Sequence, residues 1–209
     1  MAADTRTRMI EATVRALQRQ GVAGMSFTDV LRDSGAARGA IYHHFPGGKA
    51  QLVAEAATRN GHDVRAHLGG ISAESPLAVV EGFLDMVRPV LAESTHGGGC
   101  AVAAVALGAG NGAAASAAAT AATASSERDS SDDEALRQVA ATAFGSWIDQ
   151  LTERLTVSGM PPKEAADLAA TLITLLEGAH VLCRAAGSLE PFEQVVRTAT
   201  GLVRCGYPE

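Results

Sequence analysis

One short stretch near the N-terminus constrains the fold of this chain more than any other. It runs from Thr28 to Phe45 and reads TDVLRDSGAARGAIYHHF. Apolar positions recur at helical spacing on both sides of Gly35, a residue that permits the backbone conformation of a tight turn. Two short helices joined by such a turn form a helix-turn-helix, whose second helix enters the major groove of DNA. The stretch therefore predicts a DNA-reading hairpin.

The side chains of this hairpin divide into anchors and exposed groups. Thr28 stands before an apolar pair, and its hydroxyl is expected to cap the first helix of the hairpin. The second helix is expected from Arg38 onward, where Ile41 and Phe45 lie four residues apart and share one face. We expect Ile41 and Phe45 to hold the hairpin to a core, which leaves Arg38 and Tyr42 on another side.

A further helix is predicted before the hairpin. Asp4 or Thr5 can cap its start, and Gly21 is expected to end it. Its apolar face is expected to centre on Ile10, Val14 and Leu17, with Met9 and Thr13 flanking them.

The residues after the hairpin indicate a domain boundary. Pro46, Gly47 and Gly48 end the third helix, and Lys49 opens a longer one. With 47% hydrophobic but only 4% aromatic residues, and with alanine abundant, the composition favours close-packed helices. We therefore expect an all-α fold, with a three-helix helix-turn-helix domain at residues 1–48 joined to a larger helical domain at residues 49–209.

Two stretches of the larger domain invite specific predictions. The segment from Asn111 to Asp133 is rich in Ala, Ser and Thr and then acidic, so a loop or a frayed helix is expected there. Ser131 and Glu134 have the spacing of a capping box, which predicts that a helix begins at that point.

The last two predicted helices, at about residues 163–187 and 191–206, are candidates for a dimer surface. The first carries apolar residues around nearly its whole circumference, which indicates burial on all sides. A second subunit would make such burial easier in a chain of this size. The alternative is that the two helices simply pack on each other.

Charge is distributed unevenly along the chain. Residues 1–50 hold seven basic and four acidic side chains, a net charge of +3, and the rest carries −9 of the total of −6. A basic end on an acidic body orients a protein toward phosphates. The pattern favours nucleic-acid binding by the N-terminal end.

Several classes of protein are excluded. Cys100, Cys183 and Cys205 are widely spaced, which predicts neither a disulfide framework nor a metal site, and no cofactor is expected. No catalytic motif such as GxSxG, a Walker loop or HExxH occurs, so an enzyme is not expected. The N-terminus is charged and lacks the apolar run of a secretory signal, and no membrane span is expected. The protein is predicted to be cytoplasmic.

The extended hairpin, FTDVLRDSGAARGAIYHHFPGGKAQL, resembles the DNA-binding region of TetR/AcrR-type bacterial regulators over about 25 consecutive positions. The PGGK spelling and the downstream GCAVAAVAL resemble the LmrA/YxaF-like subgroup. The resemblance implies a homodimer that binds palindromic operator DNA, with a C-terminal helical domain for ligand binding and dimerisation. Members of the family usually act as repressors.

The resemblance also implies roles for single residues. By motif position, Thr28 and Lys49 look like phosphate contacts at helix N-termini. The residues that look like the groove-facing set are Arg38, Tyr42, His43 and His44. Gly39 lies among them and is short, so that few side chains reach the bases. Ala37 departs from the Ser or Thr cap common in the family, which weakens the start of the reading helix by ~1 kcal/mol.

A small-molecule effector, apolar or aromatic, is expected in the C-terminal domain. An apolar cavity with one polar group is the usual composition of such a site. The candidate lining residues are Phe83, Met86, Trp147, Leu151, Leu176 and His180. Each of them is also explained as ordinary core. Release of DNA by the ligand is the first hypothesis, and the alternatives are a co-repressor-dependent regulator, an activator, or a helical protein-interaction module.

Overall fold

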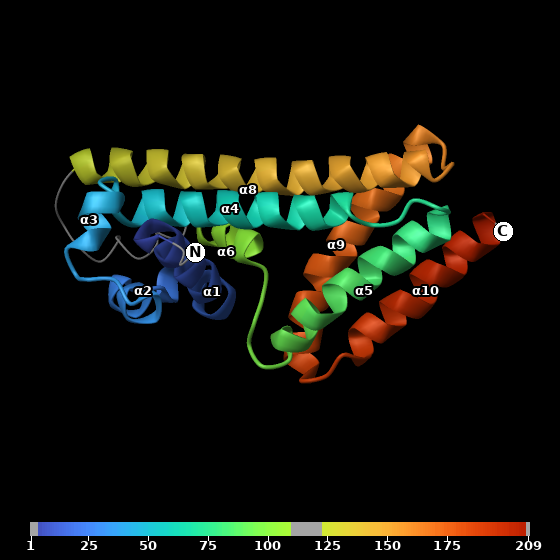
Figure 1. The fold of residues 1–209 in the computed structure, drawn as a ribbon, viewed down its shortest axis with the longest axis horizontal. Coiled ribbons are helices and arrows are strands. Elements are labelled where there is room, and N and C mark those ends of the chain that lie inside the picture. The colour runs from blue at the N-terminus through green and yellow to red at the C-terminus, as the bar shows by residue number, and fades with distance from the viewer. Residues whose placement is uncertain (1–3, 110–122, 208–209) are drawn as a thin grey trace. The chain divides into compact units, whose positions relative to one another are not determined.

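The computed structural model describes residues 4–109 and 123–207 of the chain, and every regular element in these ranges is an α-helix (Figure 1). The all-α prediction is therefore confirmed. The helices, with the labels of Figure 1, are α1 (Thr5–Gly24), α2 (Phe27–Ser34), α3 (Ala40–His44), α4 (Gly48–Gly69), α5 (Pro76–Ser94), α6 (Ala101–Gly108), α8 (Thr123–Val157), α9 (Pro162–Ala186) and α10 (Glu190–Gly206).

The helices form two compact units, each made of two separate pieces of chain. We call Met1–Asn60 with Cys100–Ala143 the N-terminal unit, and Gly61–Gly99 with Phe144–Glu209 the C-terminal unit. Helices α4 and α8 each begin in the first unit and end in the second. This packing adds α6 and part of α8 to the unit that holds the hairpin. The predicted boundary at residue 48 separates the segment expected to bind DNA from the segment expected to bind ligand and to dimerise. That division of roles stays a prediction.

Helix α1 begins where the sequence predicts. The Asp4 carboxylate accepts a hydrogen bond from the Thr7 N–H at 2.7 Å and caps the helix. Gly21 has a φ of 67° and breaks the helical path, which resumes as far as Gly24. The buried face differs from the predicted one, because Ile10 and Val14 are half-buried. The fully buried set is Met9, Ala12, Thr13, Ala16 and Leu17. Two alanines in the face let neighbouring helices approach closely.

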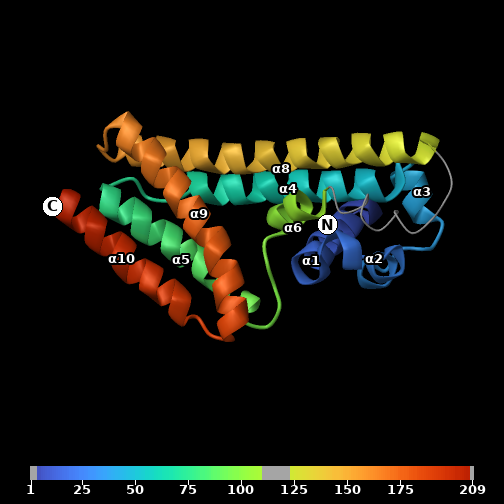
Figure 2. The same ribbon diagram turned by 180° about the vertical axis from the view of Figure 1, so that it is seen from behind.

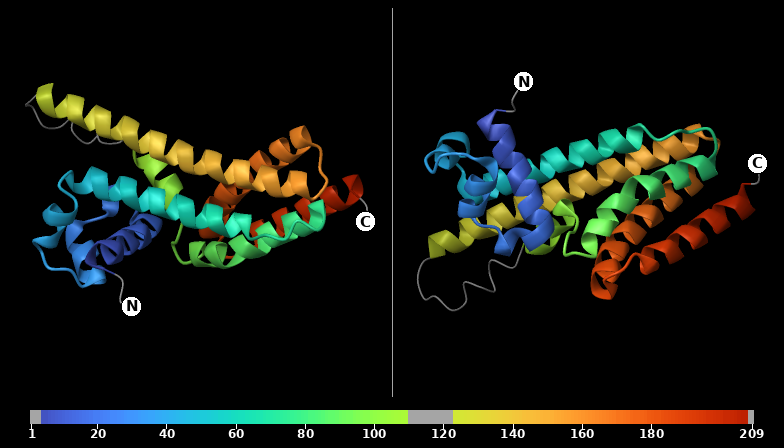
Figure 3. Two further views of the ribbon diagram at one scale, coloured as in Figure 1. Left: turned by 45° about the horizontal axis from the view of Figure 1, so that its top comes forward. Right: turned by 60° about the horizontal axis from the view of Figure 1, so that its bottom comes forward.

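Within the N-terminal unit, α1 packs against both α2 and α6, and Figure 3 shows these helices gathered together. The approach of α6 is close enough to require a glycine. A Cβ added at Gly108 would lie 2.8 Å from the Cβ of Val22. Any residue larger than glycine at position 108 would push α6 away from α1.

Helix α8 is longer than the sequence predicts. It begins at Thr123, so Ser131 and Glu134 lie inside the helix and do not form a capping box at its start. Glu134 forms an ion pair with Arg137, one turn further on, instead of reaching back to a cap. Alanine content does not explain the extension, because the segment Thr123–Ser131 holds one alanine among weaker helix formers. Residues 110–122, the rest of the predicted loop, lie outside the described residues.

Helices α5, α9 and α10 pack against one another in the C-terminal unit, as the opposite views in Figures 1 and 2 both show. Ser75 caps α5 by accepting from the Ala78 N–H at 3.1 Å, as its position before Pro76 indicates. Two ion pairs join α5 to α10, one between Arg88 and Glu193 and one between Glu81 and Arg204.

Helix α9 is the one described helix that is long and apolar enough to cross a membrane by length and composition, and 39% of its most apolar window is buried. Its buried side includes Leu172, Ile173 and Leu176, whereas Val181 and Leu182 are exposed. The predicted burial on all sides therefore does not hold for the single chain. Several of its large apolar side chains face outward, among them Leu175, Val181 and Leu182.

The C-terminal unit also buries a histidine. His180 on α9 is 7% exposed, and its Nδ1 lies 2.7 Å from the hydroxyl of Ser94 on α5, which is itself fully buried. Burial disfavours the charged imidazolium and lowers the pKa of His180 from 6.5 to about 4. The imidazole is therefore neutral in the folded protein near pH 7.

We expect this histidine to make the protein sensitive to acid. Between pH 6.5 and 4 the unfolded chain binds a proton that the folded chain excludes, so stability is complete above pH 6.5 and is lost as the pH falls. From pH 7 to pH 5 the loss attributable to His180 is about 2 kcal/mol. Urea unfolding of the wild type and of His180→Gln at pH 7 and pH 5, at one protein concentration, measures this loss of unfolding free energy. Equal pH dependence in both proteins would contradict this origin.

Candidate DNA interface

The first helix of the hairpin is capped by a residue that the sequence analysis overlooked. Ser26 accepts a hydrogen bond from the Asp29 N–H at 3.1 Å, and its hydroxyl donates to the Asp29 carboxylate at 2.7 Å. The prediction that Thr28 caps α2 is therefore wrong. The signal was present in the sequence, since Ser26 and Asp29 have the spacing of a reciprocal cap. Thr28 lies exposed in the first turn, with its hydroxyl not used as a cap.

The turn of the hairpin is built as the sequence predicts. Gly35 adopts the left-handed conformation, with φ 67° and ψ 21°, and its N–H points back to the carbonyls of Leu31 and Arg32. The Ala36 N–H donates to the Leu31 carbonyl at 3.1 Å. This pattern ends α2 sharply and permits the chain to reverse toward α3.

Helix α3 is shorter than expected and begins two residues later. It spans only Ala40–His44, and Arg38 and Gly39 lie in the turn before it. No side chain caps its start, but the N-cap residue is Gly39, whereas the missing cap was predicted at Ala37. The two predicted anchors are confirmed, because Ile41 is 2% exposed and Phe45 is fully buried.

The predicted DNA-contacting residues lie mainly on the surface of the N-terminal unit. Tyr42 is 68% exposed, and the edge of its ring contacts Phe27, at 6.3 Å between centroids. Thr28, Arg38 and Tyr42 border one hollow of about 620 Å³ on the hairpin. The structure thus brings together one predicted phosphate contact and two predicted groove-facing residues.

His43 and His44 follow Tyr42 and touch each other at 4.9 Å between ring centroids. His43 is exposed, whereas His44 is half-buried. The hydrogen bond from Thr7 lowers the pKa of the Asp4 carboxyl, and the nearby His44 adds a smaller contribution in the same direction. His44 therefore lies near the start of α1. Of the two, His43 is the more accessible.

Arg38 differs from Arg32, the other arginine of the hairpin, in its ion pairing. Arg32 forms ion pairs with Asp29 and Asp33, both at 3.0 Å. Among the described residues, no ion pair engages Arg38, which is exposed. An unpaired guanidinium retains all of its N–H donors for a base edge or a phosphate.

Lys49 is the second residue of α4 and is partly buried. Burial lowers the pKa of its ammonium group. A cation at the positive end of a helix dipole is unfavourable unless an anion lies there too. The free N–H groups of a helix N-terminus favour the same anion. The position fits a phosphate contact.

The six predicted effector-site residues all belong to the C-terminal unit. Met86 is half-buried and the other five are buried. The Trp147 indole N–H donates to the Gly61 carbonyl at 2.8 Å, and His180 is hydrogen-bonded to the hydroxyl of Ser94. The structure does not test whether a ligand displaces any of these contacts, and the set stays a prediction.

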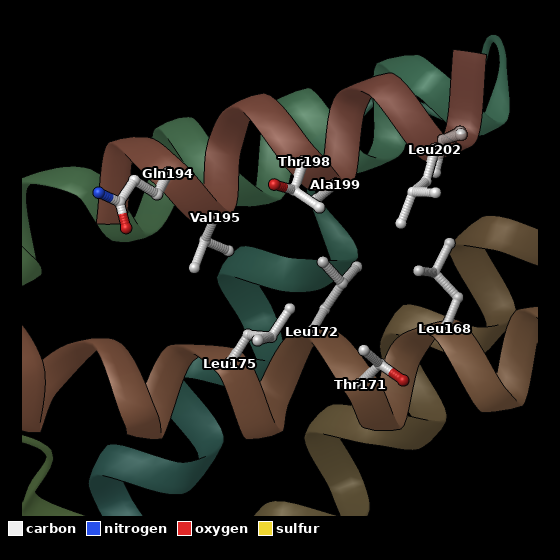
Figure 4. Close-up of a pocket in the computed structure, with 10 residues that line it drawn as sticks. Leu168, Thr171, Leu172, Leu175, Gln194, Val195, Thr198, Ala199 and Leu202 are labelled. Carbon is white, nitrogen blue, oxygen red and sulfur yellow. The ribbon is translucent and has the colours of Figure 1, made fainter. Parts of the chain in front are cut away.

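A groove of about 300 Å³ lies between α9 and α10 of the same unit (Figure 4). Leu168, Leu172 and Leu175 from α9 face Val195 and Leu202 from α10 across it. None of the six predicted effector residues lines this groove. Its lining is almost entirely apolar.

A capped helix, a left-handed glycine turn and a short second helix with an exposed basic and aromatic face define a helix-turn-helix DNA-binding protein. Residues 9–56 match the family described as bacterial regulatory proteins, tetR family, and residues 116–198 match the C-terminal domain of LmrA/YxaF-like transcriptional regulators. The chain belongs to the TetR family of transcriptional regulators, in its LmrA/YxaF-like subgroup.

Relatives match over nearly the whole chain. The uncharacterized HTH-type transcriptional regulator Rv0196 of Mycobacterium tuberculosis is 32% identical over 98% of this chain and 96% of its own length. The HTH-type transcriptional regulator LmrA of Bacillus subtilis is 26% identical over 90% of each chain. The fold is shared with a TetR transcriptional regulator from Legionella pneumophila, with a TM-score of 0.72 and 18% identity over 97% of this chain and 98% of that one.

Replacing Arg38 with Ala should reduce discrimination between operator and unrelated DNA by ~1–3 kcal/mol, because a side chain that reads a base edge contributes to one sequence only. The ratio of the two dissociation constants measures this. Arg32→Ala is the matched control, since Arg32 is exposed but paired with two carboxylates. An equal loss on both DNAs would refute a base-reading role for Arg38.

Replacing Lys49 with Ala should weaken binding to every DNA sequence and flatten the salt dependence. Loss of one phosphate contact reduces the slope of log K against log salt by ~0.9. Titrations of one duplex at several salt concentrations give this slope. If the variant instead preferred a different sequence, Lys49 would be a reading residue and the assignment would be wrong.

Proposed function

We propose that this regulator is a homodimeric repressor that a small lipophilic molecule releases from a palindromic operator in the cytoplasm. One observation supports DNA contact by the hairpin: Thr28, Arg38 and Tyr42 border the same hollow, and Arg38 has no ion pair among the described residues. Such a surface offers hydrogen-bond donors and an aromatic ring where a duplex would lie. Thr28 and Lys49 hold phosphates, and the groove-facing set is Arg38, Tyr42, His43 and His44.

The proposed dimer surface is formed by α9 and α10, close to the predicted ranges 163–187 and 191–206. Large apolar side chains are exposed on both helices: Leu175 (37%), Val181 (66%), Leu182 (57%) and Leu202 (70%). The apolar groove between the helices adds to this surface. Contiguous exposed apolar surface of this kind marks an interaction site. Isologous pairing of one such face with its own copy gives a two-fold dimer.

A two-fold dimer presents two hairpins, which fits half-sites one helical turn or more apart on a palindromic operator. Helix α4 is continuous from the N-terminal into the C-terminal unit, and so it is the proposed element of communication. A ligand among Phe83, Met86, Trp147, Leu151, Leu176 and His180 would favour the arrangement in which the two hairpins no longer match adjacent grooves. The ligand shifts the balance between the DNA-matched and the mismatched arrangement of the hairpins only because it binds one of them more tightly than the other.

A gel shift with the promoter of the protein's own gene tests this function. Binding that prefers this duplex over a scrambled one, and that a lipophilic compound found by thermal-shift screening reverses, is expected. Binding that such a compound strengthens would mean co-repression instead. No sequence-preferring binding at any salt concentration would refute operator binding.

The Leu202→Asp variant should dissociate the dimer. It places an unpaired carboxylate in the proposed interface, and burial of such a charge is strongly unfavourable. The dimer dissociation constant should rise by more than about tenfold, as sedimentation velocity over a dilution series would measure. Val157→Asp on α8 is the matched control, because Val157 is 65% exposed but lies on neither helix. If Leu202→Asp stays as dimeric as Val157→Asp, the interface lies elsewhere.

A further inference from the structure

The N-terminal turns of α1 contact the hairpin at the end of α2 and at the end of α3, its reading helix. On one side, the Arg8 Nε donates to the carbonyl of Ser34 at 3.1 Å, and its Nη2 donates to the Thr5 hydroxyl at 3.3 Å. Ser34 is the last residue of α2 and is buried. The contact therefore fixes the end of α2, immediately before the glycine turn that leads to α3.

On the other side, Arg6 engages the end of α3 and a residue about two turns into α4. Its guanidinium carbon lies 5.2 Å from the centre of the Phe45 ring, and the same group forms an ion pair with Glu55. Glu55 also accepts a hydrogen bond from the side-chain Nε2 of Gln51 at 3.0 Å. The side-chain Oε1 of Gln51 in turn accepts from the Gly47 N–H at 2.8 Å. This chain of contacts leads from α1 to the backbone of the turn between α3 and α4.

The reading helix depends on such external contacts. A helix of five residues is far below the length of ~12 residues at which isolated helices become even marginally stable, and α3 has no side-chain cap. The last carbonyls of α2 have no partners within the helix, and a cation there also complements the helix dipole. A planar guanidinium that stacks on an aromatic ring and pairs with a carboxylate is a rigid contact.

We propose that Arg6 and Arg8 are positioning residues, which hold the end of α2 and the end of the reading helix in register for DNA and do not contact phosphate themselves. The proposal rests on DNA binding by the hairpin. The Arg6 guanidinium pairs with Glu55, and Arg8 uses its Nε and Nη2 donors for Ser34 and Thr5, so both side chains are already engaged inside the protein. Arg15, on the same helix, is exposed and has no ion pair among the described residues.

Salt dependence separates positioning from phosphate contact. Full-length wild type is compared with Arg6→Gln and Arg8→Gln by fluorescence anisotropy, on the duplex of its own promoter and on a scrambled duplex, at several salt concentrations. Lys49→Ala serves as the phosphate reference and Arg15→Gln as the arginine control. The active fraction and the melting temperature are measured for each protein, so that partial unfolding is not counted as a change in affinity.

The expected result is an affinity of the active fraction for the promoter that falls by about five- to tenfold in Arg6→Gln and Arg8→Gln, as loss of a charged hydrogen bond implies. Affinity for scrambled DNA and the salt slope stay at the wild-type values. Arg15→Gln binds like the wild type. Arg6→Lys, which keeps the charge but not the planar group, does not restore the promoter affinity.

Two results would overturn the proposal. One is a salt slope reduced by ~0.9 in either glutamine variant together with rescue by Arg6→Lys, because that is the behaviour of a phosphate contact. The other is wild-type promoter affinity in both glutamine variants. If the wild type itself shows no preference for the promoter, the proposed operator binding fails, and this outcome is distinct from both.

Discussion

The burial of Ile41 and Phe45 is the constraint on which the DNA-reading surface depends. Helix α3 has one turn and little more, so its backbone hydrogen bonds alone do not hold it in place. Two anchors four residues apart fix both its position and its rotation about its own axis. Rotation matters because Tyr42 is exposed only while Ile41 beside it is buried. A small error in this packing would turn the reading side chains away from a duplex.

The two units treat apolar surface in different ways. In the N-terminal unit the apolar side chains position a few polar ones, and the large exposed apolar side chains among its described residues are Tyr42 and Leu107. In the C-terminal unit, α9 and α10 keep several large apolar side chains exposed beside an apolar groove. This difference fits a molecule in which one unit meets a charged, hydrated partner and the other meets a copy of itself.

Local chemistry explains why the hairpin was predictable from sequence. The Gly35 turn closes on carbonyls three and four residues before it, and the spacing of Ile41 and Phe45 places both on one face. The structure confirms both predictions. Errors arose where two local signals competed. Ser26 and Thr28 both offer a hydroxyl near the start of α2, and the reciprocal contact with Asp29 favours Ser26. In α8, the helix continues through the apparent cap at Ser131 and Glu134, and no local pattern in the sequence accounts for it.

Other features depend on partners far away in the sequence and leave no local pattern. Arg8 meets Ser34, and Arg6 meets Phe45 and Glu55, across separations that no periodicity reveals. The same limit applies to the buried pair of Ser94 and His180, which comes from two helices. The sequence marked His180 as unusual among apolar neighbours, but its partner is known only from the fold.

The contact of Gly108 with Val22 has a consequence for how this protein can be divided. The compact unit that carries the hairpin includes α6, which the chain reaches only after passing through part of the other unit. A fragment cut after the hairpin would leave the Val22 side of α1 open to water. Transplanting the reading hairpin to another regulator therefore means transplanting a discontinuous surface. The two units are built from alternating pieces of one chain, so neither can be excised as a single continuous fragment.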